Sequence, residues 1–378
     1  MASITNILSE IFFVPFTDAP FDGQQYARQD GDWKQVRGGV QLLSDHVIGV
    51  QMLGFGGGSG TWMNINRDGG MVNASPVYFY NHPVYSGIVE EVIDGQYMVK
   101  IPKFYYKNEN HRKIWISPTK VDDTFKIHPA FMKDGHEIDQ FWIGKYQGTN
   151  EGSNKVGSQP GKLPWVSVSW TNFKTYCANR NTGDQTGWML ASFHQWNAIC
   201  MLFLIEYATT NAQAVLGRGR VDTSSAANTD AADVATATYR GIVGWHGNVW
   251  QCLDGIDVSS YKYRLWDDKG NKTLVNTGVN CPEYGRGWNA TNSGYIIDMH
   301  TESGDSFDFG SVFIPKETSL TYSDGTYSDY FYGSNGGNTV CYVGGDWSYA
   351  SRAGCFFFHF LNVASHSATN IGCRLAKE

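Results

Sequence analysis

The closing stretch of the chain constrains its folding most, because a distinct motif stands at each end and the residues between the motifs have an unusual composition. It opens with the run GGDW at residues 344–347 and closes with NIGCR at residues 370–374. Residues 346–370, apart from Trp347, contain no Lys, Glu, Gln, Met or Trp. These five types make up about one residue in six of the chain, so their absence here has a chance of about one in a hundred. We interpret the segment as a recognition surface carried by a fixed frame.

The composition predicts β-rich, loop-rich domains held together by aromatic anchors. The chain has 378 residues, of which 43 are Gly, 15% are aromatic and only 17% are charged. This length is enough for two or three domains with cores of their own. The formal net charge is −7, whereas a protein that binds nucleic acid needs a basic face. We therefore expect no nucleic-acid partner.

The cysteines and the apolar runs predict where the chain is made. The seven cysteines are odd in number and form no CxxC pair, which is typical of free, buried thiols in a reducing cytosol. The apolar run at residues 11–14 is too short for a signal peptide, and no apolar run approaches the length of a membrane span. We expect synthesis in the cytoplasm, no signal peptide and no membrane insertion.

Turn signals in the N-terminal third predict short strands. Two Asp-Gly pairs flank a polar strand around Tyr26 within residues 18–33. Residues 87–101 are typical of two apolar strands around the Asp-Gly turn at residues 94–95. The Gly-rich run at residues 54–60 is not followed by the Lys and Ser or Thr of a phosphate loop, so we expect no nucleotide binding.

Caps and apolar periodicity predict two helices further along the chain. Ser169 is placed to cap a helix over residues 172–178. A second helix over residues 193–207 carries apolar side chains at three- and four-residue steps, the stripe of a packed helix. Residues 222–238 are rich in Ala, Thr, Asp and Ser and poor in large apolar types, which predicts a mobile surface loop.

Four motifs occur in order along residues 136–378. They are FWIGKYQGTN at 141–150, PWVSVSW with the helix after it at 164–177, GNVWQ at 247–251, and the two runs that bound residues 344–374. The ordered set resembles the C-type lectin fold in its formylglycine-generating-enzyme (sulfatase-modifying) form. The resemblance implies an α+β chain with a C-terminal C-type lectin-like domain preceded by small β-rich domains. Gln147 and Cys373 depart from that family's usual Glu and Phe.

The motifs supply an expected scaffold. Large Trp side chains can hold an irregular domain together, and the planar fork of Arg can tie loops through carbonyl or carboxylate contacts. The expected scaffold residues are Trp170, Trp245, Asn248, Trp250, Trp347, Gly354 and Arg374. In related enzymes the neighbourhood of Asn248 binds calcium, and Asp254 and Asp257 lie near it in sequence. Asn248 is therefore a calcium candidate, with hydrogen bonds to loop backbone as the alternative.

The same resemblance would allow an oxidase, and the cysteines argue against one. Formylglycine-generating enzymes oxidise their substrate with copper held by two nearby cysteines after the motif GGSW. Cys355 is the only cysteine in the corresponding stretch of this chain, and one thiolate cannot make a paired soft-ligand site. We expect no enzymatic activity, no catalytic residue and no cofactor.

Residues 344–374 also resemble the variable segment of phage tropism determinants and of related proteins that diversity-generating retroelements vary. Their mutagenesis changes adenines, mostly in AAY codons, and cannot produce the five missing residue types. By the same motif, the variable sites are Asp346, Ser348, Tyr349, Arg352, Phe357, His359, Leu361, Asn362 and His366. We expect a strand at residues 355–361 with Phe357, His359 and Leu361 facing solvent and the alternate phenylalanines facing the core.

The resemblance implies a receptor-binding protein at the tip of a phage tail fibre, located on the virion. Residues 1–50, which include a run similar to short modules of tail fibres, would attach or oligomerise. Residues 51–135 would form a β-rich intermediate domain, and residues 136–378 the receptor-binding domain. The implied partners are a bacterial surface receptor, either protein or glycan, and other phage tail proteins, with the chain as a homotrimer. A formylglycine-generating-type oxidase and a fixed sugar-binding lectin are the alternatives.

Overall fold

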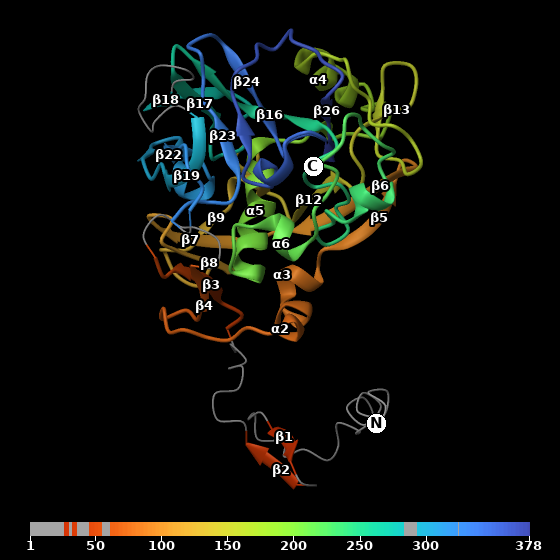
Figure 1. The fold of residues 1–378 in the computed structure, drawn as a ribbon. Coiled ribbons are helices and arrows are strands. Elements are labelled where there is room, and N and C mark those ends of the chain that lie inside the picture. Colours follow the sequence, from red (N-terminus) through yellow and green to blue (C-terminus); the bar gives the residue numbers. More distant parts are fainter. Residues whose placement is uncertain (1–25, 30–31, 36–44, 55–60, 283–292, 324) are drawn as a thin grey trace.

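The chain folds into a mixed α+β protein, which confirms the class expected from the sequence (Figure 1). The computed structural model describes residues 26–29, 32–35, 45–54, 61–282, 293–323 and 325–378. Among them, no helix is long and apolar enough to cross a membrane. The first strands, β1 (Tyr26–Gln29) and β2 (Asp32–Gln35), pair as an antiparallel hairpin, as the Asp-Gly signals predict. Most of the segment expected to attach or oligomerise lies outside the described residues.

An antiparallel sheet of five strands forms the N-terminal part of the main body (Figure 1). In spatial order its strands are β4 (Trp62–Ile65), β3 (Ile48–Met52), β8 (Lys113–Ser117), β7 (Tyr105–Glu109) and β9 (Lys126–Ile127). The sheet is fastened to the long helix of the C-terminal half, because the Asn64 side chain donates a hydrogen bond to the Ile205 carbonyl at 2.6 Å.

A second five-stranded sheet joins segments that are far apart in sequence. Its order is β15 (Trp188–Leu190), β27 (Leu375–Lys377), β12 (Gln140–Gly144), β6 (Gln96–Pro102) and β5 (Val89–Ile93). The hairpin β5–β6 turns at the predicted Asp-Gly pair. β12 pairs with β6 on one side and with β27 on the other. The boundary expected between residues 135 and 136 therefore separates strands of one sheet, and residues on both sides share one apolar core.

The largest sheet carries the closing stretch of the chain. Its order is β18 (Leu274–Asn280), β17 (Lys262–Trp266), β16 (Trp250–Ser259), β24 (Thr339–Val343), β25 (Phe358–His359), β23 (Tyr330–Tyr332), β19 (Ser293–Met299) and β22 (Pro315–Ser319). β26 (Ile371–Cys373) pairs in parallel with β16. β25 thus lies inside the sheet, between β24 and β23.

Both predicted helices form where their caps place them. α5 (Phe193–Tyr207) begins after a complete capping box between Ser192 and Gln195. α4 (Trp170–Ala178) begins two residues before the predicted start, and Ser169 accepts a hydrogen bond from the Asn172 backbone as expected. Residues 193–205 of α5 are all buried, so this helix is covered on every side, whereas the stripe predicted one packed face. The shorter helices are α2 (Pro76–Asn81), α3 (Pro83–Ser86), α6 (Ala212–Val215) and α7 (Ala232–Ala235).

Residues 222–238 lie at the surface as their composition predicts, with residues 222–225 exposed, but buried side chains anchor the segment. The buried Thr229 hydroxyl donates a hydrogen bond to the Gln159 carbonyl at 2.7 Å, and Val234 is fully buried. The remaining short elements are β10 (Met132–Lys133), β11 (His136–Glu137), β13 (Thr149–Asn150), β14 (Val156–Gly157), β20 (Ser303–Gly304), β21 (Phe307–Asp308) and the 3-10 turns Pro129–Phe131, Phe309–Ser311 and Ala350–Arg352.

Candidate ligand-binding surface

Arg374 ties together the loops beneath the closing stretch. Its guanidinium is fully buried and donates to the Gln251 side chain at 2.6 Å. It also donates to four backbone carbonyls, those of Gly144, Lys145, Val243 and Gly244, at 2.7 to 3.1 Å. Burial among neutral acceptors lowers the pKa of Arg374 to about 9. The contacts are of the carbonyl type expected for a residue that fixes loops.

Asn248 binds protein groups rather than presenting oxygen to a cation. Its side-chain oxygen accepts a hydrogen bond from the Ala227 backbone at 2.8 Å, and its nitrogen donates to the Gln147 side chain at 2.8 Å. Asp254 is paired with a lysine and Asp257 with an arginine. No group of three or more His, Cys, Asp or Glu is placed to hold a metal ion in the part of the chain that the structure describes. The candidate calcium ligands therefore do not fit the ion.

The tryptophans of the expected scaffold differ in burial. Trp245 is fully buried and stacks on Tyr239, with ring centroids 5.0 Å apart. Trp170 is half-buried and donates to the Leu253 carbonyl at 2.8 Å. Trp250 is 3% exposed, and Trp347 is half-buried.

Gly354 is required by a close approach to Asp329. A Cβ at position 354 would lie 2.1 Å from the nearest Asp329 carboxylate oxygen. That carboxylate is fully buried and accepts a hydrogen bond from the Phe356 backbone at 2.8 Å. The contact fixes the turn that leads from the exposed part of the closing stretch into β25.

The strand predicted over residues 355–361 forms only at β25, Phe358–His359, and the side chains along this stretch alternate as predicted, but both sides are buried. Phe356, Phe358 and Phe360 pack in the main core. Phe357 points to the other side, yet it is also fully buried, and its ring centroid lies 4.6 Å from that of Trp250. The expectation that Phe357 faces solvent is therefore wrong, because Trp250 from β16 covers the second face of the strand.

Two more of the nine expected sites are buried. His359 is 8% exposed, and burial together with the nearby His366 lowers its pKa to about 4, so its imidazole is neutral at physiological pH. Asp346 is 1% exposed. Its carboxylate accepts hydrogen bonds from the Ser348 backbone at 2.8 Å and from the Asn370 side chain at 2.6 Å. Asp346 therefore joins the two ends of the segment rather than presenting its charge to a ligand.

The other six expected sites reach the surface. Ser348, Arg352 and His366 are exposed, and Tyr349, Leu361 and Asn362 are half-buried. The Tyr349 ring lies 5.2 Å from that of Phe357, and the Arg352 guanidinium lies 4.8 Å above the ring of Tyr330. The buried residues of the segment thus support the exposed ones.

A row of half-buried or exposed tyrosines continues from the segment across the sheet, and the sequence analysis missed it. In order the tyrosine row is Tyr349, Tyr332, Tyr330, Tyr295 and Tyr322, with neighbouring centroids 6.1, 5.2, 5.2 and 5.3 Å apart. The density of tyrosines between residues 322 and 332 was the available signal. No motif marks these residues, because strand pairing over long sequence distances brings them together.

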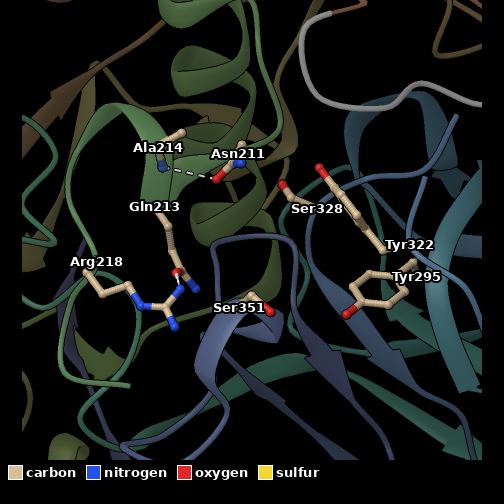
Figure 2. Close-up of a pocket in the computed structure, with 8 residues that line it drawn as sticks. All are labelled: Asn211, Gln213, Ala214, Arg218, Tyr295, Tyr322, Ser328 and Ser351. Carbon is tan, nitrogen blue, oxygen red and sulfur yellow. Dashed lines mark hydrogen bonds between the residues drawn. The ribbon is translucent and has the colours of Figure 1, made fainter. Parts of the chain in front are cut away.

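The tyrosine row ends at a pocket of about 430 Å³ (Figure 2). Tyr295 and Tyr322 form one side, and residues of α6 and the segment after it form the opposite side. Ser351, from the closing stretch, lies between the two sides. The pocket therefore borders Arg352, which follows Ser351 in the chain and is one of the six positions that reach the surface.

No family model and no curated protein matches this chain in sequence. Among solved structures, the Major Tropism Determinant M1 variant matches with 12% identity over 75% of this chain, at a TM-score of 0.32. The match covers 63% of that protein, less than two thirds of its length.

Two further solved structures are similar to this chain. The Treponema denticola variable protein 1 matches with 12% identity over 76% of this chain and 98% of its own, at a TM-score of 0.35. PvdO from Pseudomonas aeruginosa matches with 12% identity over 77% and 97%, at a TM-score of 0.30. The tropism determinant and the variable protein carry the names of the family that residues 344–374 resemble. Because these TM-scores lie below 0.5, we assign no residue role by correspondence and rely on the geometry of this chain.

Proposed function

We propose that this chain is the receptor-binding protein at the tip of a phage tail fibre and that residues 346–370 present its diversifiable surface. The virion location, the homotrimer and the attachment role of residues 1–50 belong to the same proposal. The receptor is a molecule of the bacterial surface. The contacting side chains are Ser348, Tyr349, Arg352, Leu361, Asn362 and His366, and the buried Asp346, Phe357 and His359 support them.

One observation carries this proposal. The segment with the restricted composition, residues 346–370, is also the segment whose two ends are held in place by buried residues. Residues 346–370 lack five residue types apart from Trp347, and buried residues hold both ends: Asp346 at one end, and Arg374, between β26 and β27, just beyond the other. Exposed side chains on a rigid scaffold can change without unfolding it. Tyr and Arg, both present here, are the types that most often anchor interfaces.

The proposal includes no catalytic activity, and the cysteine geometry supports this. Cys355 does have a second cysteine beside it, since the Cys200 thiol of α5 donates a hydrogen bond to the Cys355 backbone carbonyl at 3.4 Å. Both thiols are fully buried, and burial raises the pKa of each. Protonated thiols inside a core are poor soft-metal ligands and are closed to a peptide substrate. Turnover of a thiol-containing peptide in the presence of copper would instead favour the oxidase alternative.

Two experiments test the proposed function. The purified chain should compete with phage adsorption on the bacterium where a phage carrying this gene forms plaques, because both would occupy one receptor. The gene should also lie beside a reverse transcriptase gene and an adenine-rich near-copy of its own 3′ end. Undiminished adsorption at saturating protein would overturn receptor binding. Competition without the near-copy would favour a fixed lectin.

A further inference from the structure

The pocket at the end of the tyrosine row offers uncharged hydrogen-bonding groups beside aromatic rings. Asn211, Gln213, Ser328 and Ser351 line it with amides and hydroxyls, and Tyr295 and Tyr322 line it with rings (Figure 2). Its volume of about 430 Å³ is within the range of sites that hold small ligands.

Among the described lining residues, the one charged side chain is already neutralised. Arg218 donates two hydrogen bonds to the Asp222 carboxylate, at 2.7 and 2.9 Å, and a third to the Gln213 side-chain oxygen. A bidentate ion pair of this kind leaves little attraction for a free carboxylate or phosphate. The pocket chemistry therefore favours an uncharged ligand.

The lining also includes polar side chains that a ligand can reach. Asn211 is half-buried and Ser351 is exposed, and both line the pocket. Ser328 lines it too, but its hydroxyl is buried, so the polar contacts to a ligand fall to Asn211 and Ser351.

The wall formed by the closing stretch is held in place by α6. The Gln213 side-chain amide donates to the carbonyls of Ala350 and Ala353, at 2.8 and 2.7 Å. These two bonds bracket Ser351, so this part of the diversifiable segment is fixed beside the pocket. Arg352, the next residue, interacts with the Tyr295 hydroxyl and so links the exposed surface to the aromatic wall.

We propose that this pocket binds an uncharged saccharide unit of the receptor, so that the receptor is a surface glycan. This inference rests on the proposed function. The apolar faces of a sugar ring match the rings of Tyr295 and Tyr322, and its hydroxyls match the Asn211 amide and the Ser351 hydroxyl. The neighbouring variable side chains then contact the sugars or substituents that flank the bound unit. Several copies on a virion would raise the strength of attachment through effective concentration.

The test titrates the full chain with a panel of short, uncharged oligosaccharides. The panel contains gluco-, galacto-, manno- and N-acetylglucosamine-configured members, and binding is read by saturation-transfer NMR and calorimetry. We expect saturable binding of at least one member. Tyr295→Ala and Tyr322→Ala should each weaken it by about tenfold. Tyr80→Ala is the matched control, because Tyr80 is 75% exposed on α2 and does not line the pocket.

The outcomes separate this inference from the proposed function. If no panel member binds saturably, or if the two pocket variants bind as well as the Tyr80→Ala variant, the saccharide proposal is wrong. Phage competition by the wild-type chain would in that case leave receptor binding intact and point to a protein receptor. Saccharide binding without phage competition would instead remove the phage role and keep the pocket. Thermal unfolding of each variant distinguishes a lost contact from a lost fold.

Discussion

Arg374 is a buried polar residue whose replacement we expect to be strongly destabilising. Its five hydrogen bonds go to acceptors inside the frame, and a lysine ammonium, which is a single point charge, can reach only some of them. Arg374→Lys should lower the free energy of unfolding by about 3 kcal/mol or more, measured in urea. Arg352→Lys, in the exposed part of the same segment, is the control and should change it by less than about 0.5 kcal/mol. A loss of less than about 1 kcal/mol for Arg374→Lys would contradict this role.

Asp329 should give the unfolding free energy a pH dependence. Burial raises its pKa to about 7, above the 3.8 of an exposed carboxyl. Because the folded pKa is the higher one, the stabilisation from the protonated group is complete below about pH 4 and is lost as the pH rises to about 7. Asp329→Asn cannot ionise, so it should gain at least about 1 kcal/mol relative to wild type between about pH 5 and about pH 8. Urea unfolding of both proteins measures this, and an equal difference at both pH values would contradict the raised pKa.

At the scale of elements, the sequence predicted those helix ends and turns that depend only on residues close to one another in the chain. The start of α5 and the turn between β5 and β6 follow from a capping box and an Asp-Gly pair, which act within a few residues. The exposure of β25 was mispredicted because it depends on Trp250, which lies in another strand more than a hundred residues earlier. Alternation within one strand sets the two faces, and only tertiary packing decides whether a face meets water.

The packing of β25 leads to a prediction for its second face. Phe357 is fully buried against Trp250 and Tyr349, so Phe357→Ala should lower the free energy of unfolding by about 3–5 kcal/mol, measured by denaturant unfolding. Leu361, expected to share that face, is half-buried, and Leu361→Ala should cost about 1 kcal/mol. Equal small losses for both variants would show that Phe357 faces solvent after all.

At the scale of the whole molecule, the sequence predicted the α+β class but not how the segments combine. The expected boundary after residue 135 fails as a core boundary because β6 and β12 pair across it. The expected scaffold residues lie in motifs that can be recognised in the sequence, and Arg374 donates hydrogen bonds to carbonyls as those motifs suggested. No sequence motif marks the tyrosine row or the pocket, because β19, β23 and the segment after α6 meet only in the folded chain.

In the proposed function, buried residues hold residues 346–370 in a rigid arrangement, and the side chains that reach the surface are replaceable and contact a receptor. The variant Arg352→Glu/Asn362→Lys/His366→Glu changes three side chains that reach the surface and keeps Ser348, whose hydroxyl donates a hydrogen bond to Asp346. Its control is Lys120→Glu/Asp123→Lys, an exposed pair outside the closing stretch. The direct measurement is adsorption to host cells of phage that carry each variant, with thermal unfolding of the purified chains alongside. We predict that the triple variant lowers adsorption at least about tenfold while its unfolding temperature stays within a few degrees of wild type. Adsorption equal to that of the control would contradict the claim.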